Sequence, residues 1–351
     1  MTTLSKEINC LMAASRPFAL ATVIGHKGST PRTSGSRMLV RQDKTIAGTI
    51  GGGLVEARVM EACTAMLDVP CSKVMDFTLD NEIKADMDMI CGGGMTLWLR
   101  SFVPPFSQEL IRTYQSLADL ESKRKKILII TRVTGGRPGD PVLVSETAPD
   151  QAAALLPKTL MADISDFRFS GPGPFRQFYG LDEYMVETIS PGDTLYIFGA
   201  GHVGFQLGRL AHTVDFSTVV IDDREEFADP DRFPHARQVL AVPEFASAFE
   251  GLDIDGHSYI AILTRGHLHD QTVLAQALDT RAAYIGMIGS GRKRKQIYAN
   301  LMEKGVDRTA LEAVHSPIGT EIMAETPAEI AVSIVGELIL ERAKRNGAPA
   351  A

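Results

Sequence analysis

The part of the chain that most restricts its fold is residues 194–224, which contain a dinucleotide-binding βαβ unit in order. The short apolar run Leu195 to Phe198 predicts a buried parallel strand, and the glycine motif GAGHVG at 199–204 opens a helix. A second predicted strand, Thr218 to Ile221, ends at Asp222, about where a carboxylate accepts hydrogen bonds from a ribose diol. This order of elements predicts that the second half of the chain binds a nucleotide.

Each glycine of the motif has its own expected role. Gly199 permits the tight turn, Gly201 lets a diphosphate approach the backbone, and Gly204 allows close packing of helix on strand. The phosphates would lie at the helix N-terminus, where backbone N–H groups are free. His202, between the glycines, belongs to the same set of candidate cofactor-binding residues.

The length of the chain and its turn sequences predict two domains. The 351 residues, 44% of them hydrophobic, are enough for two cores. The turn sequence Ser-Pro-Gly at 190–192 directly precedes the nucleotide unit, so we expect an N-terminal domain over 1–189 and a C-terminal domain over 190–351. Alternating strands and helices in the second predict a Rossmann-like, doubly wound parallel sheet of the α/β class. The first domain is predicted to be mixed α+β.

Composition excludes several classes of function. The net charge of −7 opposes general affinity for nucleic acid. No apolar run approaches the roughly 20 residues that span a membrane, and the N-terminus lacks the apolar core of a signal peptide, so a cytoplasmic location is expected. The four cysteines show no CxxC spacing and are expected to be free thiols.

Three glycine-rich loops mark the first domain. Arginines lie in the first loop, at 26–37, and a run of glycines precedes a predicted helix in the second. Such loops point backbone amides at an anion or a polar heterocycle. The alternative is that the glycines only shape tight turns and the arginines lie in solvent. The candidate ligand-binding residues are Arg32, Arg37, Gly51, Gly52 and Gly53.

Cys91 begins the third loop and is followed by three glycines. A thiol with so little cover is open to a ligand, and nearby amides would favour the thiolate that attacks sulfur or binds metal. Burial as an inert side chain is the alternative. Cys63, at an apolar helix position, is expected in the core.

Two further loops in the second domain follow predicted strands. TRGHLHD at 264–270 contains an HxH pair, which lacks a third metal ligand other than the adjacent Asp270, so a ligand contact or a helix cap is favoured over a metal site. GSGRKRK at 289–295 joins a glycine turn to four cations, which suits an anion, with a solvated basic surface as the alternative. The candidate residues are Arg265, His267, Gly289 and Arg292.

These motifs, in this order, resemble the XdhC/CoxI family of accessory proteins for molybdenum hydroxylases such as xanthine dehydrogenase. The resemblance covers nearly the whole chain. In the first domain it rests on GSTPRTSGSRMLV, GTIGGGLVE and CGGG. In the second it rests on IFGAGHVG, VVIDDREEFA, TRGHLHD, IGMIGSGRKR and SPIGTEIMAETPAEIAVSIVGELI. One departure is Thr320-Glu321 and Met323, where similar chains often have smaller or more apolar residues.

The resemblance implies a maturation factor rather than a catalyst. Such a protein binds the pyranopterin molybdenum cofactor, in its mononucleotide or dinucleotide form, and protects it during sulfuration. It then delivers the cofactor to the apo-enzyme of a molybdenum hydroxylase, with a cysteine desulfurase as sulfur donor. On this hypothesis Cys91 contacts molybdenum or relays sulfur, Arg32 and Arg37 hold anionic groups, and the 199–204 loop with Asp222 holds the phosphate side.

Two other functions use the same nucleotide motif. An NAD(P)-dependent oxidoreductase needs an acid or base near the nicotinamide, and His267 or His269 is available for it. A nucleotide-sensing regulatory protein needs no further chemistry. The oligomeric state is open, with a homodimer as the default expectation because two-fold dimers are the commonest assemblies.

Overall fold

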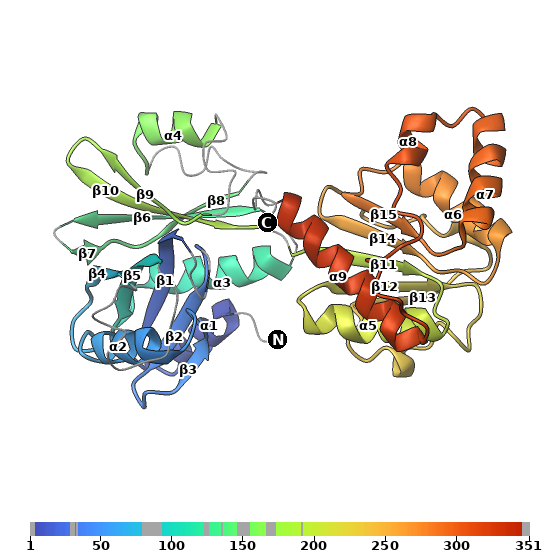
Figure 1. Cartoon of the computed structure of the whole chain (residues 1–351). Coiled ribbons are helices and arrows are strands. Elements are labelled where there is room, and N and C mark those ends of the chain that lie inside the picture. The colour runs from blue at the N-terminus through green and yellow to red at the C-terminus, as the bar shows by residue number, and fades with distance from the viewer. Residues whose placement is uncertain are drawn as a thin grey trace. The chain divides into compact units, whose positions relative to one another are not determined.

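The chain forms two compact units, Met1–Pro191 and Gly192–Ala351, each with its own sheets and hydrophobic clusters (Figure 1). The computed structural model describes residues 4–28, 32, 34–78, 93–122, 126–134, 136–145, 155–165, 173–190 and 192–345. Within them, no helix combines the length and the apolar character needed to cross a bilayer.

The first unit is built from antiparallel sheets and helices, which confirms the predicted mixed α+β class. One sheet has the order β3-β2-β1-β5-β4, and the other has the order β7-β6-β10-β9 with β8 also paired to β6. In chain order the elements are α1 (Leu4–Ala13), β1 (Phe18–Lys27), β2 (Arg37–Arg41), β3 (Ile46–Gly48), α2 (Gly53–Thr64), β4 (Ser72–Thr78), β5 (Gly94–Phe102), α3 (Gln108–Ser122), β6 (Ile127–Thr134), β7 (Arg137–Pro138), β8 (Val142–Ser145), α4 (Lys158–Ser165), β9 (Phe175–Tyr179) and β10 (Asp182–Ile189).

Helices cover both faces of the first sheet in this unit. On one face, α2 packs Val55, Val59 and Cys63 against the strands. Burial raises the pKa of Cys63 to about 12, so this thiol is an inert part of the core, as its helix position predicted. On the other face, α1 and α3 pack between this sheet and β6 of the second sheet.

The second unit is a parallel sheet with the order β13-β12-β11-β14-β15, which confirms the predicted Rossmann-like fold. In chain order its elements are β11 (Thr194–Phe198), α5 (His202–Thr213), β12 (Ser217–Asp222), η2 (Pro230–Arg232), β13 (Gln238–Ala241), η3 (Phe245–Ser247), β14 (Ser258–Ile262), α6 (His267–Leu278), β15 (Tyr284–Met287), α7 (Gly291–Glu303), α8 (Arg308–Glu312) and α9 (Pro327–Arg345).

The strand order of this sheet locates its ligand edge. α5 and α9 pack on one face of the sheet, and α6 and α7 pack on the other (Figure 1). From β11 the chain moves to β12 on one side and later returns to β14 on the other. In doubly wound sheets ligands bind outside the carboxyl ends of the strands where the order reverses in this way. The loops after β11, β12, β14 and β15, called the carboxyl edge below, therefore form the expected site.

Candidate functional site

The glycine loop between β11 and α5 is shaped by two glycines and left open at a third. Gly199 has a φ of 115°, and a Cβ there would lie 2.3 Å from the carbonyl oxygen of Leu263. A Cβ on Gly204 would lie 2.0 Å from the carbonyl oxygen of Gly199, whereas a Cβ on Gly201 would have no atom within 4 Å. Packing therefore requires Gly199 and Gly204, while Gly201 faces space that a ligand can enter. His202, the first residue of α5, is exposed beside it.

Two helices at the carboxyl edge begin without a side-chain cap. α5 follows Gly201 and α6 follows Gly266, and neither glycine offers an acceptor to the first-turn amides. α7 differs, because the hydroxyl of Ser290 accepts a hydrogen bond from the backbone N–H of Lys293. The first turns of α5 and α6 therefore keep backbone donors that suit an anionic ligand.

Asp222, at the end of β12, is a structural tie between two loops. Its carboxylate accepts hydrogen bonds from the backbone N–H of Ala200 at 2.7 Å and from the backbone N–H of Arg224 at 3.1 Å. The guanidinium of Arg224 donates two more, at 2.8 and 3.0 Å. Burial alone would raise the pKa of Asp222, but these donors outweigh it and lower the pKa. A carboxylate has about four acceptor positions, so Asp222 has little capacity left for a ribose diol.

Asp223, the next residue, has the capacity that Asp222 lacks. Its side chain is 10% exposed, and one carboxylate oxygen accepts a hydrogen bond from Arg265 at 2.8 Å. The other oxygen, Oδ1, lies 3.8 Å from the Arg224 guanidinium and is buried without a hydrogen-bond partner among the described residues. Because Arg265 follows β14 and Asp223 follows β12, their ion pair joins the loops on either side of the glycine loop.

A cavity of about 460 Å³ lies at the starts of α6 and α7 and is called the edge cavity below. Its position after β14 and β15 places it on the same carboxyl edge. Arg292 has no ion pair among the described residues, so its charge is available to a ligand. The residues that line the edge cavity are His267, Ser290, Arg292, Lys293 and Gln296.

Lys293 lines the edge cavity, but its charge is already used. Its ammonium pairs with Asp270, which is fully buried and also accepts a hydrogen bond from the hydroxyl of Thr264. Burial raises the pKa of Asp270 even beside this cation. Gly289 has a φ of 156°, and a Cβ there would lie 2.9 Å from the Lys293 side chain. Gly289 therefore makes room for the Lys293–Asp270 pair.

The two histidines of the HxH motif point to different neighbours. His267 lines the edge cavity, while the ring of His269 packs 5.3 Å from the ring of Phe245, measured between centroids. Among the described residues, no group of three or more His, Cys, Asp or Glu side chains is arranged to hold a metal ion. The geometry thus favours the ligand-contact interpretation of this motif over a metal site.

In the first unit, two of the predicted anion-binding elements have internal partners. Arg37 forms a 2.9 Å ion pair with Glu187 of β10, whose side chain is 5% exposed. The carboxylate of Glu56 accepts hydrogen bonds from Thr49 and from the backbone N–H of Ile50, at the start of the 51–53 loop. An anionic ligand at either place would compete with a carboxylate of the protein itself. Arg32 is exposed.

A cavity of about 350 Å³ lies where β1 and β4 end and β5 begins. His26, Lys27 and Asp76 line it, so it presents groups of both signs of charge. The described chain resumes beside it at 93, after the gap at 79–92. Cys91, the predicted thiol, lies outside the described residues.

Asp223, Glu56 and Glu187 shape these sites, and sequence reasoning singled out none of them. Asp223 adjoins the predicted Asp222, and Glu56 lies in the first turn of the helix after the glycines, so both had a local signal. Glu187 had no signal, because its partner Arg37 is distant in the sequence.

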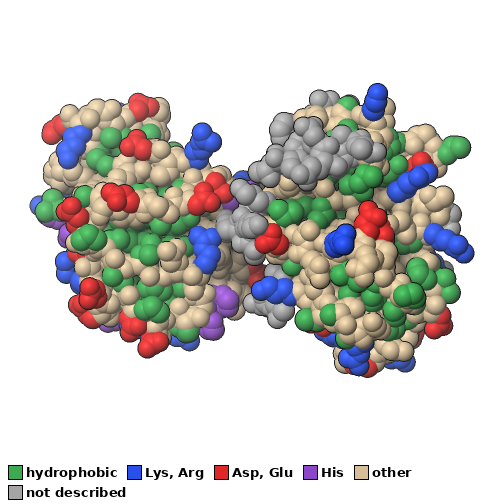
Figure 2. All heavy atoms as spheres, turned by 180° about the vertical axis from the view of Figure 1, so that it is seen from behind, with side chains coloured by type: hydrophobic (Ala, Val, Ile, Leu, Met, Phe, Trp, Pro, Cys, Tyr) green, Lys and Arg blue, Asp and Glu red, His purple; other side chains and the backbone are tan. Residues whose placement is uncertain are grey.

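Charge on the visible surface supports local rather than broad anion binding. On the face of the molecule in Figure 2, acidic and basic side chains are interspersed. Positive charge gathers instead at particular places, such as the consecutive cations at 292–295.

Two family models match the chain. One, described as the XdhC Rossmann domain, matches residues 195–338, and the other, described as the XdhC and CoxI family, matches residues 11–78. The chain belongs to the XdhC/CoxI family. The first match runs from β11 into α9 and contains the whole carboxyl edge, whereas Cys91 lies outside both matched ranges.

Several known proteins are similar to this XdhC/CoxI chain. A Bacillus subtilis (strain 168) protein, named as part of a probable xanthine dehydrogenase, is 25% identical over 342 residues, 95% of this chain and 96% of that protein. The Escherichia coli (strain K12) molybdenum cofactor insertion chaperone PaoD is 22% identical over 344 residues, 96% of this chain and 87% of PaoD. The uncharacterized protein YqeB of Escherichia coli (strain K12) is 26% identical over 98% of this chain, and the chain spans 45% of YqeB.

The fold is also found in a solved structure. A crystal structure of a Bacillus halodurans protein named xanthine dehydrogenase matches with a TM-score of 0.75 and 23% sequence identity. The match covers 99% of this chain and 98% of the other. At this identity the likeness establishes a common fold.

Proposed function

We propose that this protein binds the molybdenum cofactor and delivers it to the apo-enzyme of a molybdenum hydroxylase. Family membership supports the proposal, as do the relatives named as a molybdenum cofactor insertion chaperone and as part of a probable xanthine dehydrogenase. The observation that carries it is the start of α5, where uncapped amides and an open position at Gly201 suit an anion. The cofactor's phosphate is such an anion.

The residues of the carboxyl edge fit the phosphate side of this cargo. The phosphate would accept hydrogen bonds from the first-turn amides of α5, with His202 beside them. A dinucleotide form adds a ribose, and Oδ1 of Asp223, which has no hydrogen-bond partner among the described residues, is placed to accept hydrogen bonds from its hydroxyls. Arg265, His267 and Arg292 supply further donors along the edge.

The test compares Gly201→Ala with Gly204→Ala in protein purified from cells that make the cofactor. A Cβ at Gly201 meets no protein atom, so the variant should keep its melting temperature while the methyl group obstructs the phosphate and lowers bound molybdenum and pterin. A Cβ at Gly204 meets the Gly199 carbonyl, so that variant should melt lower. Full cofactor retention in Gly201→Ala would contradict the proposal.

We further propose that Cys91 contacts molybdenum or relays sulfur from a cysteine desulfurase. This step rests on the thiol chemistry of the CGGG motif. Its test is Cys91→Ala in a reconstituted assay that scores cofactor retention and hydroxylase activation separately. If both stay at the wild-type level, Cys91 has no such role.

An NAD(P)-dependent oxidoreductase would use the same glycine loop and the same Asp223. Thermal denaturation with NAD(H) or NADP(H) separates the two functions. A ligand at one hundred times its dissociation constant stabilises by about 2.7 kcal/mol, which is a measurable shift. Such a shift, in protein that retains no pterin, would favour the oxidoreductase.

A further inference from the structure

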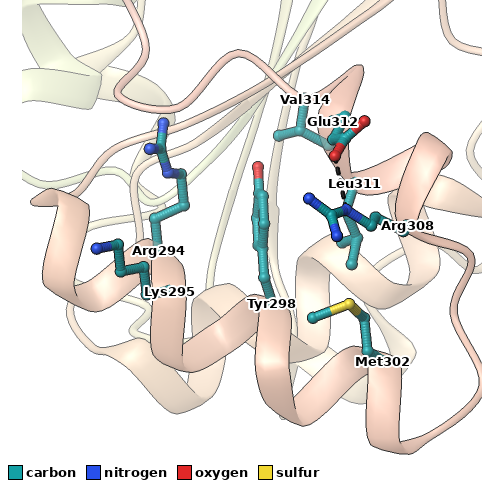
Figure 3. Close-up of a pocket in the computed structure, with 8 residues that line it drawn as sticks. All are labelled: Arg294, Lys295, Tyr298, Met302, Arg308, Leu311, Glu312 and Val314. Carbon is teal, nitrogen blue, oxygen red and sulfur yellow. Dashed lines mark hydrogen bonds and ion pairs between the residues drawn. The ribbon is translucent and has the colours of Figure 1, made fainter.

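A cavity of about 480 Å³ lies between α7 and α8, separate from the edge cavity, and is called the α7–α8 cavity below. Figure 3 shows side chains from both helices converging on it. No motif predicted it and the proposed function does not use it. Its volume is within the range of small-molecule sites. The residues that line it are Arg294, Lys295, Tyr298, Met302, Arg308, Leu311, Glu312 and Val314.

The helical period of α7 divides its consecutive cations between the two cavities. Arg292 and Lys293 line the edge cavity, while Arg294 and Lys295 line the α7–α8 cavity. Arg294 is one and two turns before Tyr298 and Met302, so these three side chains share one face of the helix. The two cavities are therefore built from different faces of α7 and can be tested independently.

The α7–α8 cavity has a surplus of positive charge. Arg294, Lys295 and Arg308 line it, and Glu312 is its only acidic lining residue among those described. The 2.8 Å pair between Arg308 and Glu312 is exposed, at 78% and 60% of the two side chains, so a ligand can replace it at little cost. Arg294 is held in place by its hydrogen bond to the carbonyl oxygen of Ser316.

An unpartnered hydroxyl group adds a specific requirement for an acceptor. Tyr298 rises from α7 between Arg294 and Arg308 (Figure 3), and its hydroxyl is buried without a hydrogen-bond partner among the described residues. Burial also raises the pKa of Tyr298, so the group remains a donor. A buried donor left unpaired is costly, and a ligand oxygen would satisfy it.

The remaining lining is apolar. Leu311 and Val314 are buried, and Met302 is 44% exposed at the rim. Together with the ring of Tyr298 they suit a flat, apolar body. We infer that the α7–α8 cavity binds a small aromatic carboxylate, with its ring against Tyr298 and Met302 and its carboxylate among Arg294, Lys295 and Arg308.

The experiment titrates the full-length protein with 2-naphthoate and benzoate, using isothermal calorimetry and thermal denaturation. The neutral probe 2-naphthamide and inorganic phosphate are the matched controls. We expect saturable binding of the carboxylates, tighter for naphthoate because it buries more ring, and at least tenfold weaker binding of the amide and of phosphate.

Three variants locate the binding. Lys295→Gln removes an exposed charge and should weaken naphthoate binding about tenfold, the loss expected for one charge-assisted hydrogen bond. Tyr298→Phe removes only the hydroxyl and should weaken binding without lowering the melting temperature. Arg292→Gln, in the edge cavity, should leave the affinity for naphthoate unchanged.

Several results would overturn the inference. Absence of carboxylate binding up to millimolar concentration is one, and binding of phosphate alone is another. Loss of binding in Arg292→Gln but not in Lys295→Gln would move the ligand to the carboxyl edge. Binding of a short acidic peptide in place of naphthoate would indicate a protein-docking pocket instead.

Discussion

Two adjacent aspartates divide the roles that one residue was expected to combine. Asp222 is 1% exposed and joins the glycine loop to Arg224, while Oδ1 of Asp223 is left without a hydrogen bond among the described residues. Their neighbours in space, not their types, separate a structural carboxylate from one available to bind. The expected ribose contact therefore belongs to Asp223 in our proposal.

Asp223→Asn should weaken binding of the dinucleotide form of the cofactor about tenfold and leave the mononucleotide form unaffected, because only the former contains a ribose. Its melting temperature should stay close to that of the wild type. Asp222→Asn should instead destabilise the protein by about 2 kcal/mol, because it weakens a buried, multiply bonded tie. Equilibrium binding and chemical denaturation measure the two effects. Equal loss of both cofactor forms in Asp223→Asn would contradict the assignment.

At the scale of elements, α9 shows how one helix is attached to its sheet. Its N-terminus has the predicted capping box, in which Thr326 and Glu329 exchange hydrogen bonds. Further along, the carboxylate of Glu337 accepts hydrogen bonds from Tyr284 and from the backbone N–H of Gly319, and it pairs with His315 at 3.1 Å. These contacts join α9 to β15 and to the segment that precedes the helix.

The pH dependence of this attachment follows from its pKa shifts. The hydrogen bond to Glu337 raises the pKa of His315. The stability from His315 is therefore complete below its ordinary pKa of about 6.5 and is lost as the pH rises through the raised value. Burial would raise the pKa of Glu337, but its donors outweigh it and lower the pKa, so its contribution is lost only as the pH falls through that lowered value.

A double-mutant cycle of His315→Gln and Glu337→Gln, followed by chemical denaturation at several pH values, measures this coupling. We expect the coupling energy to be largest at about pH 5 to 6 and to decline toward alkaline pH. A coupling energy that stays constant from acid to alkaline pH would show that protonation of His315 does not contribute.

At the scale of the whole molecule, the second unit contains all that a stable domain requires. Its two large hydrophobic clusters, one on each face of the sheet, draw only on residues within Gly192–Ala351. Its strands pair only with one another among the described residues. We therefore expect residues 192–351, expressed alone, to fold.

Circular dichroism and two-dimensional NMR of this fragment test the expectation. A single cooperative thermal transition and well-dispersed amide signals are the predicted results. A fragment with helical signal but no cooperative transition would show that its core depends on the first unit.

The parts predicted correctly from the sequence are those whose determinants are consecutive residues. The βαβ unit, the capping box of α9 and the core position of Cys63 follow from local period, turn residues and spacing. Family membership followed from the same local motifs. Local backbone preference and hydrophobic period act over a few residues, so one sequence is enough to reveal them.

Only the tertiary structure decided which polar groups remain available. Arg37 is paired with Glu187, Lys293 is used by Asp270, and the hydroxyl of Tyr298 is left without a partner among the described residues. These outcomes depend on residues that folding brings together from distant parts of the chain. The sequence by itself determined the nucleotide-type half-sheet and the family, because these are written in consecutive residues. The division of each charge between structure and ligand was decided by packing, because a charged group buried beside an opposite charge is no longer available to bind.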